Sequence, residues 1–407
     1  MSIVVLNHMP SKIVNFKDWL EEAKETVEYI MPLKRQREFE SLGYQNLHLV
    51  DNYFDDQSVL KILKKINSKS KISALIALDE LDLERASLFR EYFGIEGQKY
   101  GETIIFRNKY FMKLFALKSG IKIPKFTYSS PKHPLDLEFI NSAKKYVLKD
   151  VDGTGSINIR VESGEEIVKK INMQEEKLIE EYIDIKNMYS VDGLILNGKV
   201  IFSCLHRYNQ PTIDSNGEFT NNIVEIVSPD EPIYSEAMEF HNTLLPYYEN
   251  FLFNGCYAFH TEIFHTTSNQ FLLCELHCRC GGARISELIR QSYSISMEEI
   301  IVKYAAGIID LENLHFPKIP NKLHAVFMPP KKKGEVLEFP DSLPFEWVVE
   351  YQSRVRKGKI VKSLNYSSDC AAFVIISGEN KKNLWDRISE LEEYFKETYK
   401  VKENNYE

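Results

Sequence analysis

Short apolar runs alternate with longer amphipathic segments along the first hundred residues. The runs predict buried strands at residues 3–6, 46–50 and 73–77. The longer segments space their apolar residues as on one face of a helix, at residues 15–29, 59–66 and 81–93. This alternation predicts a parallel sheet covered by helices. No glycine-rich dinucleotide fingerprint follows these strands, which disfavours a nicotinamide cofactor.

Beyond residue 100 the pattern changes from strand–helix units to hairpins. The stretch "GLILNGKVIFS" predicts a hairpin, because Asn197-Gly198 fits a tight type I′ turn. The stretch "HTEIFHTTSNQFLLCEL" predicts a second hairpin, with its turn at residues 267–269. Further helices are expected at residues 109–119, 286–306 and 383–399, and further strands at 146–149, 347–351 and 371–376. The fold class is therefore predicted to be α/β, with a parallel sheet followed by antiparallel pairs.

Composition excludes several classes of function. The 407 residues suit two or three domains, and 51 basic against 59 acidic residues give a net charge of −8. A negative chain is a poor partner for nucleic acid. No stretch approaches the roughly 18 apolar residues of a membrane span, and the first residues lack the features of a leader peptide. Six cysteines are sparse for this length, so we expect free thiols in a cytoplasmic protein.

The stretch "CELHCRCGG" (274–282) gathers thiols, an imidazole and a carboxylate. Alternate side chains of a strand point to opposite faces. One face would then carry Leu273, Glu275, His277 and Arg279, and the other Cys274, Cys278 and Cys280. A tetrahedral zinc site needs ligands that converge on one point, so we expect the three thiols to be small buried hydrophobes.

The preceding strand offers His260 and Glu262 as same-face neighbours. Two carboxylates on paired strands, here Glu262 and Glu275, can hold a hard cation such as Mg²⁺ and link it to nucleotide phosphates. Hydrogen-bonded side-chain ladders on exposed strands would explain the same residues. Both interpretations stay open on the residues alone.

The order "HTE" (260–262) followed by "ELHCRCGG" (275–282) resembles the ATP-grasp fold, in which a strand glutamate precedes a Glu-x-Asn-x-Arg segment. The resemblance implies that Glu262 and Glu275 bind Mg²⁺. His277 stands where asparagine is usual and is the third candidate ligand. An imidazole suits transition metals better than an amide oxygen does. Whether His277 contacts the metal, and whether Mn²⁺ replaces Mg²⁺, stays open.

Three more segments resemble the family in the same order. "RNKYFMKLFALKSGIKIPKF" (107–126) resembles the entry helix, "YVLKDVDGTGS" (146–156) the phosphate-covering flap, and "LIEEYIDIKNMYSVDG" (178–193) the adenine hinge. An ordinary glycine turn is the alternative for the flap. Met188 stands where many members have the ribose-binding glutamate, so Asp184 is only a candidate. The resemblance assigns ATP binding to Lys109, Lys149, Gly153, Thr154, Gly155, Ser156, Glu180, Glu181, Tyr182, Ile183, Asp184 and Leu273.

The resemblance also implies a division of the chain. Residues 1–105 would form an N-terminal α/β domain that precedes the ATP-grasp domain. Residues 106–310 would form the ATP-grasp domain, with a nucleotide-lid part at 106–190 and an antiparallel catalytic part at 191–310. Residues 311–407 would form a C-terminal α+β subdomain.

The implied reaction converts a substrate carboxylate to an acylphosphate, with ADP as product. Arg279 would stabilise the transferred phosphoryl group or hold the carboxylate. Arg284 would anchor an amino-acid carboxylate, unless it makes a surface ion pair instead.

Among ATP-grasp enzymes, the chain resembles L-amino acid ligases and the amino-acid:carrier-protein ligases of butirosin-type antibiotic biosynthesis. The acceptor would be an amine or the pantetheine thiol of a carrier protein, and the identity of the amino acid stays open. Whether the protein forms a homodimer stays open. A carboxylase, a purine-pathway enzyme and a non-catalytic nucleotide-binding protein are the alternatives.

Overall fold

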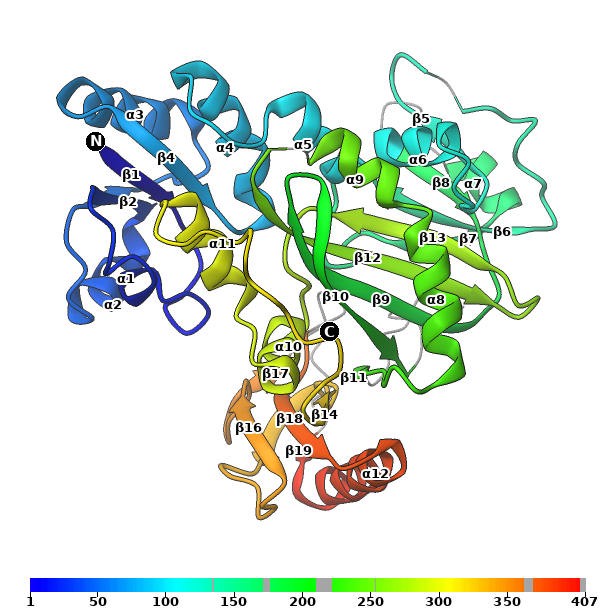
Figure 1. Ribbon diagram of the computed structural model, residues 1–407. Coiled ribbons are helices and arrows are strands. Elements are labelled where there is room, and N and C mark those ends of the chain that lie inside the picture. The colour runs from blue at the N-terminus through cyan, green and yellow to red at the C-terminus, as the bar shows by residue number, and fades with distance from the viewer. Residues whose placement is uncertain (134, 171–175, 210–221, 253, 362–368, 403–407) are drawn as a thin grey trace.

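The computed structural model describes residues 1–133, 135–170, 176–209, 222–252, 254–361 and 369–402. It confirms an α/β chain in which a parallel sheet precedes a large antiparallel one (Figure 1). Among the described residues, no helix is both long and apolar enough to cross a membrane.

The N-terminal sheet contains four parallel strands in the order β3-β2-β1-β4. Its strands are β1 (Ser2–Leu6), β2 (Thr26–Pro32), β3 (Leu47–Val50) and β4 (Ile72–Ala77). The accompanying helices are α1 (Phe16–Trp19), η1 (Leu33–Arg35), α2 (Gln36–Ser41), α3 (Asp56–Lys69) and α4 (Glu80–Phe93). The strands and helices predicted from residue 46 to residue 93 are therefore confirmed.

The helix predicted over residues 15–29 is wrong. The helix found in this segment, α1, is one turn long. The second half of the segment forms β2, which lies between β1 and β3 in the sheet. The run "TVEYIMP" is rich in β-branched and aromatic residues, which fit a pleated surface. Pairing with two neighbouring strands outweighs the local helical spacing.

A small four-stranded sheet, ordered β5-β8-β6-β7, follows the two helices α5 (Tyr100–Arg107) and α6 (Lys109–Lys118). Asn108 caps α6 by accepting hydrogen bonds from the backbone N–H groups of Tyr110 and Phe111. The remaining elements of this part are β5 (Phe126–Ser129), β6 (Lys145–Asp150), β7 (Arg160–Ser163), α7 (Gly164–Lys170) and β8 (Lys177–Glu181).

The large sheet has eight strands in the order β13-β12-β9-β10-β11-β14-β18-β16. Its strands are β9 (Ile185–Leu196), β10 (Lys199–Tyr208), β11 (Asn222–Ile226), β12 (Cys256–Thr266), β13 (Phe271–His277), β14 (Leu323–Met328), β16 (Val348–Ser353) and β18 (Ala372–Gly378). Both predicted hairpins are present. Asn197 and Gly198 have φ values of 49° and 81°, as a type I′ turn requires.

Strands from beyond Pro320 extend this sheet, and a separate small sheet contains β15 (Gly334–Glu338), β17 (Ile360–Val361) and β19 (Lys400–Lys402). The other helices are α8 (Pro232–Asn242), α9 (Leu245–Phe251), α10 (Ile285–Tyr293), α11 (Met297–Ala305) and α12 (Lys381–Thr398). The single helix predicted over residues 286–306 is wrong. Ser294 adopts a left-handed conformation with φ 59°, which ends α10 before α11 begins.

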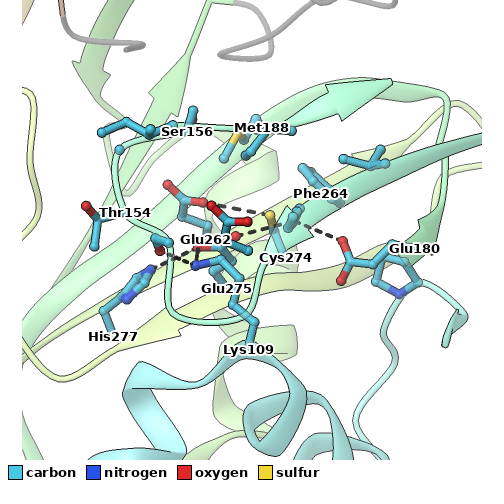
Figure 2. A pocket seen from close by; sticks show the side chains of 18 of the residues that line it. Lys109, Thr154, Ser156, Glu180, Met188, Glu262, Phe264, Cys274, Glu275 and His277 are labelled. Atoms are coloured by element: carbon cyan, nitrogen blue, oxygen red, sulfur yellow. Dashed lines mark hydrogen bonds and ion pairs between the residues drawn. The ribbon is translucent and has the colours of Figure 1, made fainter. Parts of the chain in front are cut away.

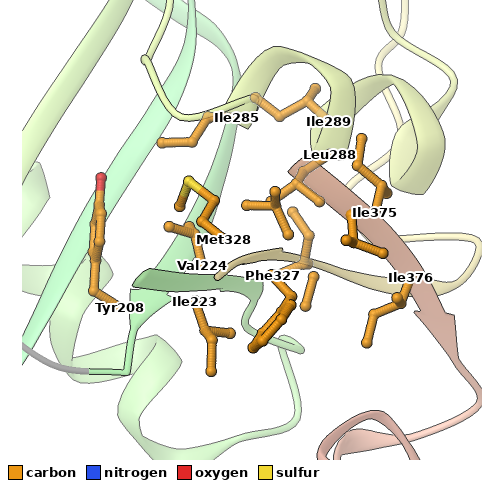
Figure 3. Close-up of a cluster of buried hydrophobic side chains, with 14 of the residues drawn as sticks. Tyr208, Ile223, Val224, Ile285, Leu288, Ile289, Phe327, Met328, Ile375 and Ile376 are labelled. Atoms are coloured by element: carbon orange, nitrogen blue, oxygen red, sulfur yellow. The ribbon is translucent and has the colours of Figure 1, made fainter. Parts of the chain in front are cut away.

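Helix α10, which follows β13 in the chain, packs on the other half of the large sheet. Its residues Ile285, Leu288 and Ile289 are fully buried against apolar side chains of β11, β14 and β18 (Figure 3). The short segment between β13 and α10 is therefore held at both ends. This segment contains Arg279 and two glycines.

Gly193 is expected to be indispensable for the central strands. A Cβ at this position would lie 2.0 Å from the carbonyl oxygen of Phe202 and 2.8 Å from the ring of Phe259. Gly193→Ala should therefore lower the free energy of unfolding by about 2 kcal/mol or more, measured by chemical denaturation. Gly101→Ala is the matched control, since a Cβ in that position of α5 meets nothing within 4 Å. Equal stability of the two variants would contradict the packing at Gly193.

Candidate functional site

A cavity lies between the four-stranded sheet β5-β8-β6-β7 and the large sheet, under the loop that joins β6 to β7. It brings together all but three of the residues predicted to form a site. Those that line it are Lys109, Lys149, Gly153, Thr154, Gly155, Ser156, Glu180, Glu181, Tyr182, Ile183, Glu262, Glu275, His277 and Arg279. The three that do not are Asp184, Leu273 and Arg284.

Two carboxylates form the centre of the cavity. Glu262 on β12 and Glu275 on β13 are direct partners in the antiparallel register. Figure 2 shows them together between the loop that carries Thr154 and the helix that carries Lys109. Paired antiparallel positions keep Cβ atoms about 5 Å apart, so the two side chains can serve one ligand.

Lysines from two other elements converge on Glu275. The Nζ atom of Lys109, on α6, lies 3.3 Å from its Oε2, and the Nζ atom of Lys149, on β6, lies 3.3 Å from its Oε1. Burial raises the pKa of Glu275, but the charges of both lysines outweigh it and hold the pKa well below its usual value. Glu275 is therefore an anion at neutral pH.

A second cluster of buried charges lies around Glu180 on β8. Glu180 lies 2.9 Å from Lys149 Nζ and 2.8 Å from Lys113 Nζ. Burial raises the pKa of Glu180, and the charges of the two lysines lower it below its usual value. The sequence analysis missed Lys113. Its spacing of four residues from Lys109 on the predicted helix is a signal that could have found it.

A β-bulge changes which side chains of β13 face the cavity. Glu275 pairs with Glu262, but the next partner of β12 is Leu273, so Cys274 is an extra residue in the strand. Cys274 consequently lines the cavity, with its Sγ 3.7 Å from Glu262 Oε2, and Leu273 is buried in the core on the other side. The predictions that Leu273 contacts nucleotide and that Cys274 faces away are wrong. Strict alternation does not apply across a bulge.

The other two thiols of this stretch lie away from the cavity, as predicted. Cys278 is buried in the core, and Cys280 is partly buried against another part of the core. All six cysteines are free thiols. Burial raises the pKa of Cys278 to about 12, so the thiol stays neutral.

The first turn of α4 contributes a carboxylate that the sequence analysis did not single out. Glu80 pairs with Arg107, its Oε2 lies 2.7 Å from Arg279 Nε, and its Oε1 lies 3.4 Å from His277 Nδ1. Burial raises the pKa of Glu80, and the neighbouring positive groups lower it far below its usual value. These partners are 27 to 199 residues away in the chain, so no local pattern could have indicated the contact.

His277 lies between two carboxylates. Its Nε2 is 3.2 Å from Glu275 Oε2, and its Nδ1 faces Glu80. Within the described residues, no group of three or more His, Cys, Asp or Glu side chains is arranged to hold a metal ion. The three predicted metal ligands are therefore not assembled into one coordination group. Two carboxylates suit Mg²⁺, which takes one or two carboxylates together with substrate phosphates.

A network of buried side chains supports Glu262. His260 Nε2 lies 3.4 Å from Glu262 Oε1, and His260 Nδ1 lies 2.7 Å from Asp192 Oδ1. Burial lowers the pKa of His260, but the charge of Asp192 outweighs it and raises the pKa to about 9. Ser190 donates a hydrogen bond to Asp192, which fixes the carboxylate. His260 lines the same cavity, so Glu262 has a cation beside it there.

The remaining predicted residues lie elsewhere. Arg284 pairs with Glu350 and lies 3.4 Å from Glu287, and its side chain is 14% exposed, so it forms ion pairs at a partly buried position rather than on an exposed surface. Asp184 is exposed, and its backbone carbonyl accepts a hydrogen bond from Thr267. Met188 lines the cavity instead.

Comparison with known proteins places this geometry in context. No family model matches the chain. An L-arginine-specific L-amino acid ligase of Bacillus subtilis is 22% identical over 372 residues, which cover 87% of this chain and 86% of that protein.

Solved structures share the whole architecture. The L-amino acid ligase of Bacillus licheniformis aligns with a TM-score of 0.77 at 14% identity, covering 99% of both chains. The biotin carboxylase domain of Hydrogenobacter thermophilus 2-oxoglutarate carboxylase, solved with MgADP and bicarbonate, aligns with a TM-score of 0.69 at 14% identity, covering 98% of this chain and 90% of that one. The chain therefore has the ATP-grasp fold.

Proposed function

We propose that this protein is an ADP-forming ligase that activates an amino acid as an acylphosphate and transfers the acyl group to an amine. The observation that carries the proposal is the convergence of Lys109 and Lys149 on Glu275, with Glu262 paired beside it. A relative named as an L-amino acid ligase and a similarly named solved structure support the choice of substrate class.

Glu262 and Glu275 would hold Mg²⁺, which neutralises phosphate charge when bound. Lys109 and Lys149 would donate hydrogen bonds to phosphate oxygens in exchange for their present contacts with Glu275. Glu180 and the backbone up to Ile183 would bind the adenine. Positioning and electrostatic stabilisation are the main contributions that a protein makes to phosphoryl transfer.

The loop at residues 152–156 would exclude water from the acylphosphate. Two contacts hold it over the cavity: Lys109 Nζ donates to the carbonyl of Gly153 at 2.6 Å, and Arg107 Nη2 donates to that of Asp152 at 3.1 Å. A closed loop protects an intermediate that water would hydrolyse. The same loop must open for exchange of nucleotide.

Arg279 would bind the substrate carboxylate or the transferred phosphoryl group, and Glu80 would orient it. A carboxylate oxygen of the amino acid would attack the γ-phosphorus of ATP, and ADP would leave with the electron pair of the broken P–O bond. The incoming amine would then attack the acyl carbon, an amide bond would form, and phosphate would leave with the electron pair of the broken C–O bond. The amine nitrogen loses its proton in this step. The pantetheine thiol of a carrier protein in antibiotic biosynthesis is the alternative acceptor, and bicarbonate the alternative carboxyl donor of a carboxylase.

A hydroxylamine assay tests the reaction. We expect Mg-ATP, hydroxylamine and one or more members of an amino-acid panel to give ADP and the corresponding hydroxamate. Free amines, a pantetheinylated carrier protein and bicarbonate, supplied separately, identify the acceptor and test the carboxylase alternative. If neither an amino acid of the panel nor bicarbonate leads to ADP formation, the proposal is contradicted.

Glu275→Gln should reduce ADP formation at least about 100-fold, because a neutral amide replaces the anion that would bind the metal. Circular dichroism and thermal unfolding check that the variant folds. Glu236→Gln is the matched control, since Glu236 is exposed on α8. Wild-type turnover by a folded Glu275→Gln variant would remove the assignment of this residue.

Glu80→Gln should lower kcat about tenfold, as loss of a supporting hydrogen-bond partner does at other sites. It should also lower the free energy of unfolding by about 3 kcal/mol, since Arg107 and Arg279 lose their buried counter-charge. Glu80→Asp, which keeps the charge, should restore part of kcat. A stability loss with unchanged kcat and unchanged KM for the amino acid would limit Glu80 to a structural role.

A further inference from the structure

A second cavity, of about 360 Å³, lies between the N-terminal sheet and the large sheet. Its walls are the edge strand β4, the segment between α4 and α5, the beginning of β12, and helix α11, which lies between the two sheets (Figure 1). Arg279 borders both cavities, but the proposed reaction uses none of the other residues of this one. Its volume is in the range of small-molecule sites.

Arg90 brings a positive charge to this cavity without a carboxylate to balance it. Its Nε and Nη2 donate to the carbonyl oxygen of Leu75 at 3.1 and 2.9 Å, and its Nη1 donates to that of Gln98 at 3.4 Å. Across the described ranges of the chain, no acidic side chain forms an ion pair with it. Glu96 lines the rim but is exposed.

Arg90 is only partly buried, and the burial of the rest of its side chain lowers its pKa. Carbonyl dipoles compensate a partly desolvated guanidinium only in part, and an opposite charge compensates it better. The guanidinium has five N–H groups, of which three donate the hydrogen bonds described above and two do not. The guanidinium can therefore accept an anionic partner.

Gln98 presents a second donor at the same wall. Its side chain is among the buried polar groups at 3% exposure, and its Nε2 makes no hydrogen bond to any nitrogen or oxygen of the described residues. The neighbouring thiol of Cys278 is only a weak acceptor. A thiol satisfies this buried amide only weakly, and a ligand oxygen would satisfy it better.

Apart from Arg279 and the exposed Glu96 at the rim, the rest of the wall is apolar or neutral. Burial raises the pKa of the Cys256 thiol to about 12, so it adds no negative charge. The apolar lining includes Ala74, Leu83, Ala258 and Ile301. A ligand that fits this wall combines one anionic group with a small apolar body.

We propose that this cavity binds a small carboxylic acid. Its carboxylate would accept hydrogen bonds from the Arg90 guanidinium and the Gln98 amide, and its hydrocarbon body would pack on β4, β12 and α11. The site is separate from the nucleotide site, because Glu262, Glu275 and the lysines do not line it. Binding therefore requires neither ATP nor a metal ion.

Calorimetric titration of the full chain without ATP tests this site, with 4-methylpentanoate as the probe and its neutral amide as the control ligand. We expect the acid to bind at one site and the amide to bind at least tenfold more weakly. Gln98→Glu should reduce the affinity for the acid at least tenfold, because the new carboxylate would occupy Arg90 and repel the ligand. Arg90→Lys, which keeps the charge but loses the guanidinium fork, should also weaken binding.

Two control variants separate this site from the nucleotide site. Glu96→Gln at the rim and Glu275→Gln in the first cavity should both leave the affinity for 4-methylpentanoate unchanged. Thermal unfolding identifies which variants are folded. Three results would overturn the proposal: no saturable binding at millimolar acid, equal binding of acid and amide, or wild-type affinity in a folded Gln98→Glu or Arg90→Lys variant. Each is independent of whether Glu275→Gln abolishes ADP formation.

Discussion

The anionic state of the partly buried Glu275 is the constraint on which the site depends. Removing a carboxylate from water is costly unless nearby positive groups compensate it. Here the compensation comes from α6, β6 and the His277 side chain, which three separate parts of the chain provide. The four-stranded sheet that contains β6, helix α6 and the large sheet must therefore meet at one point. Nucleotide phosphates would bind the two lysines that contact Glu275 in this structure.

Glu80 extends the same electrostatic principle to the N-terminal sheet. One carboxylate faces Arg107, His277 and Arg279, and Arg107 also contacts the loop over the cavity. The loop, the N-terminal sheet and the strand end that carries Arg279 consequently share one network of contacts. Helix α10 holds the far side of this strand end by apolar packing. Arg279 is thus fixed by charge on one side and by hydrophobic burial on the other.

The two cavities differ in how their charges are balanced. In the first, each buried acid has a positive partner, so a charged ligand must exchange partners with the protein. In the second, Arg90 donates to carbonyl oxygens, and among the described residues it has no acidic partner and the Gln98 amide has no nitrogen or oxygen acceptor. The first arrangement suits a phosphate chain with its metal, and the second suits a small acid. Arg279 is the side chain that borders both.

The sequence by itself determined the α/β class and the hairpins, and it predicted that Glu262 and Glu275 lie on paired strands, whereas the bulge at Cys274 sets them directly opposite each other. Each depends on a local pattern, either a repeat of two or 3.6 residues or a turn that only a few residues can form. Only the tertiary structure decided that residues 26–32 form a strand, that Cys274 replaces Leu273 at the cavity, and that Glu80 pairs with Arg279. These features depend on strand partners, on one bulged residue and on charges 199 residues apart. Such contacts leave no periodic signal in the chain, because they are set by which elements meet in space.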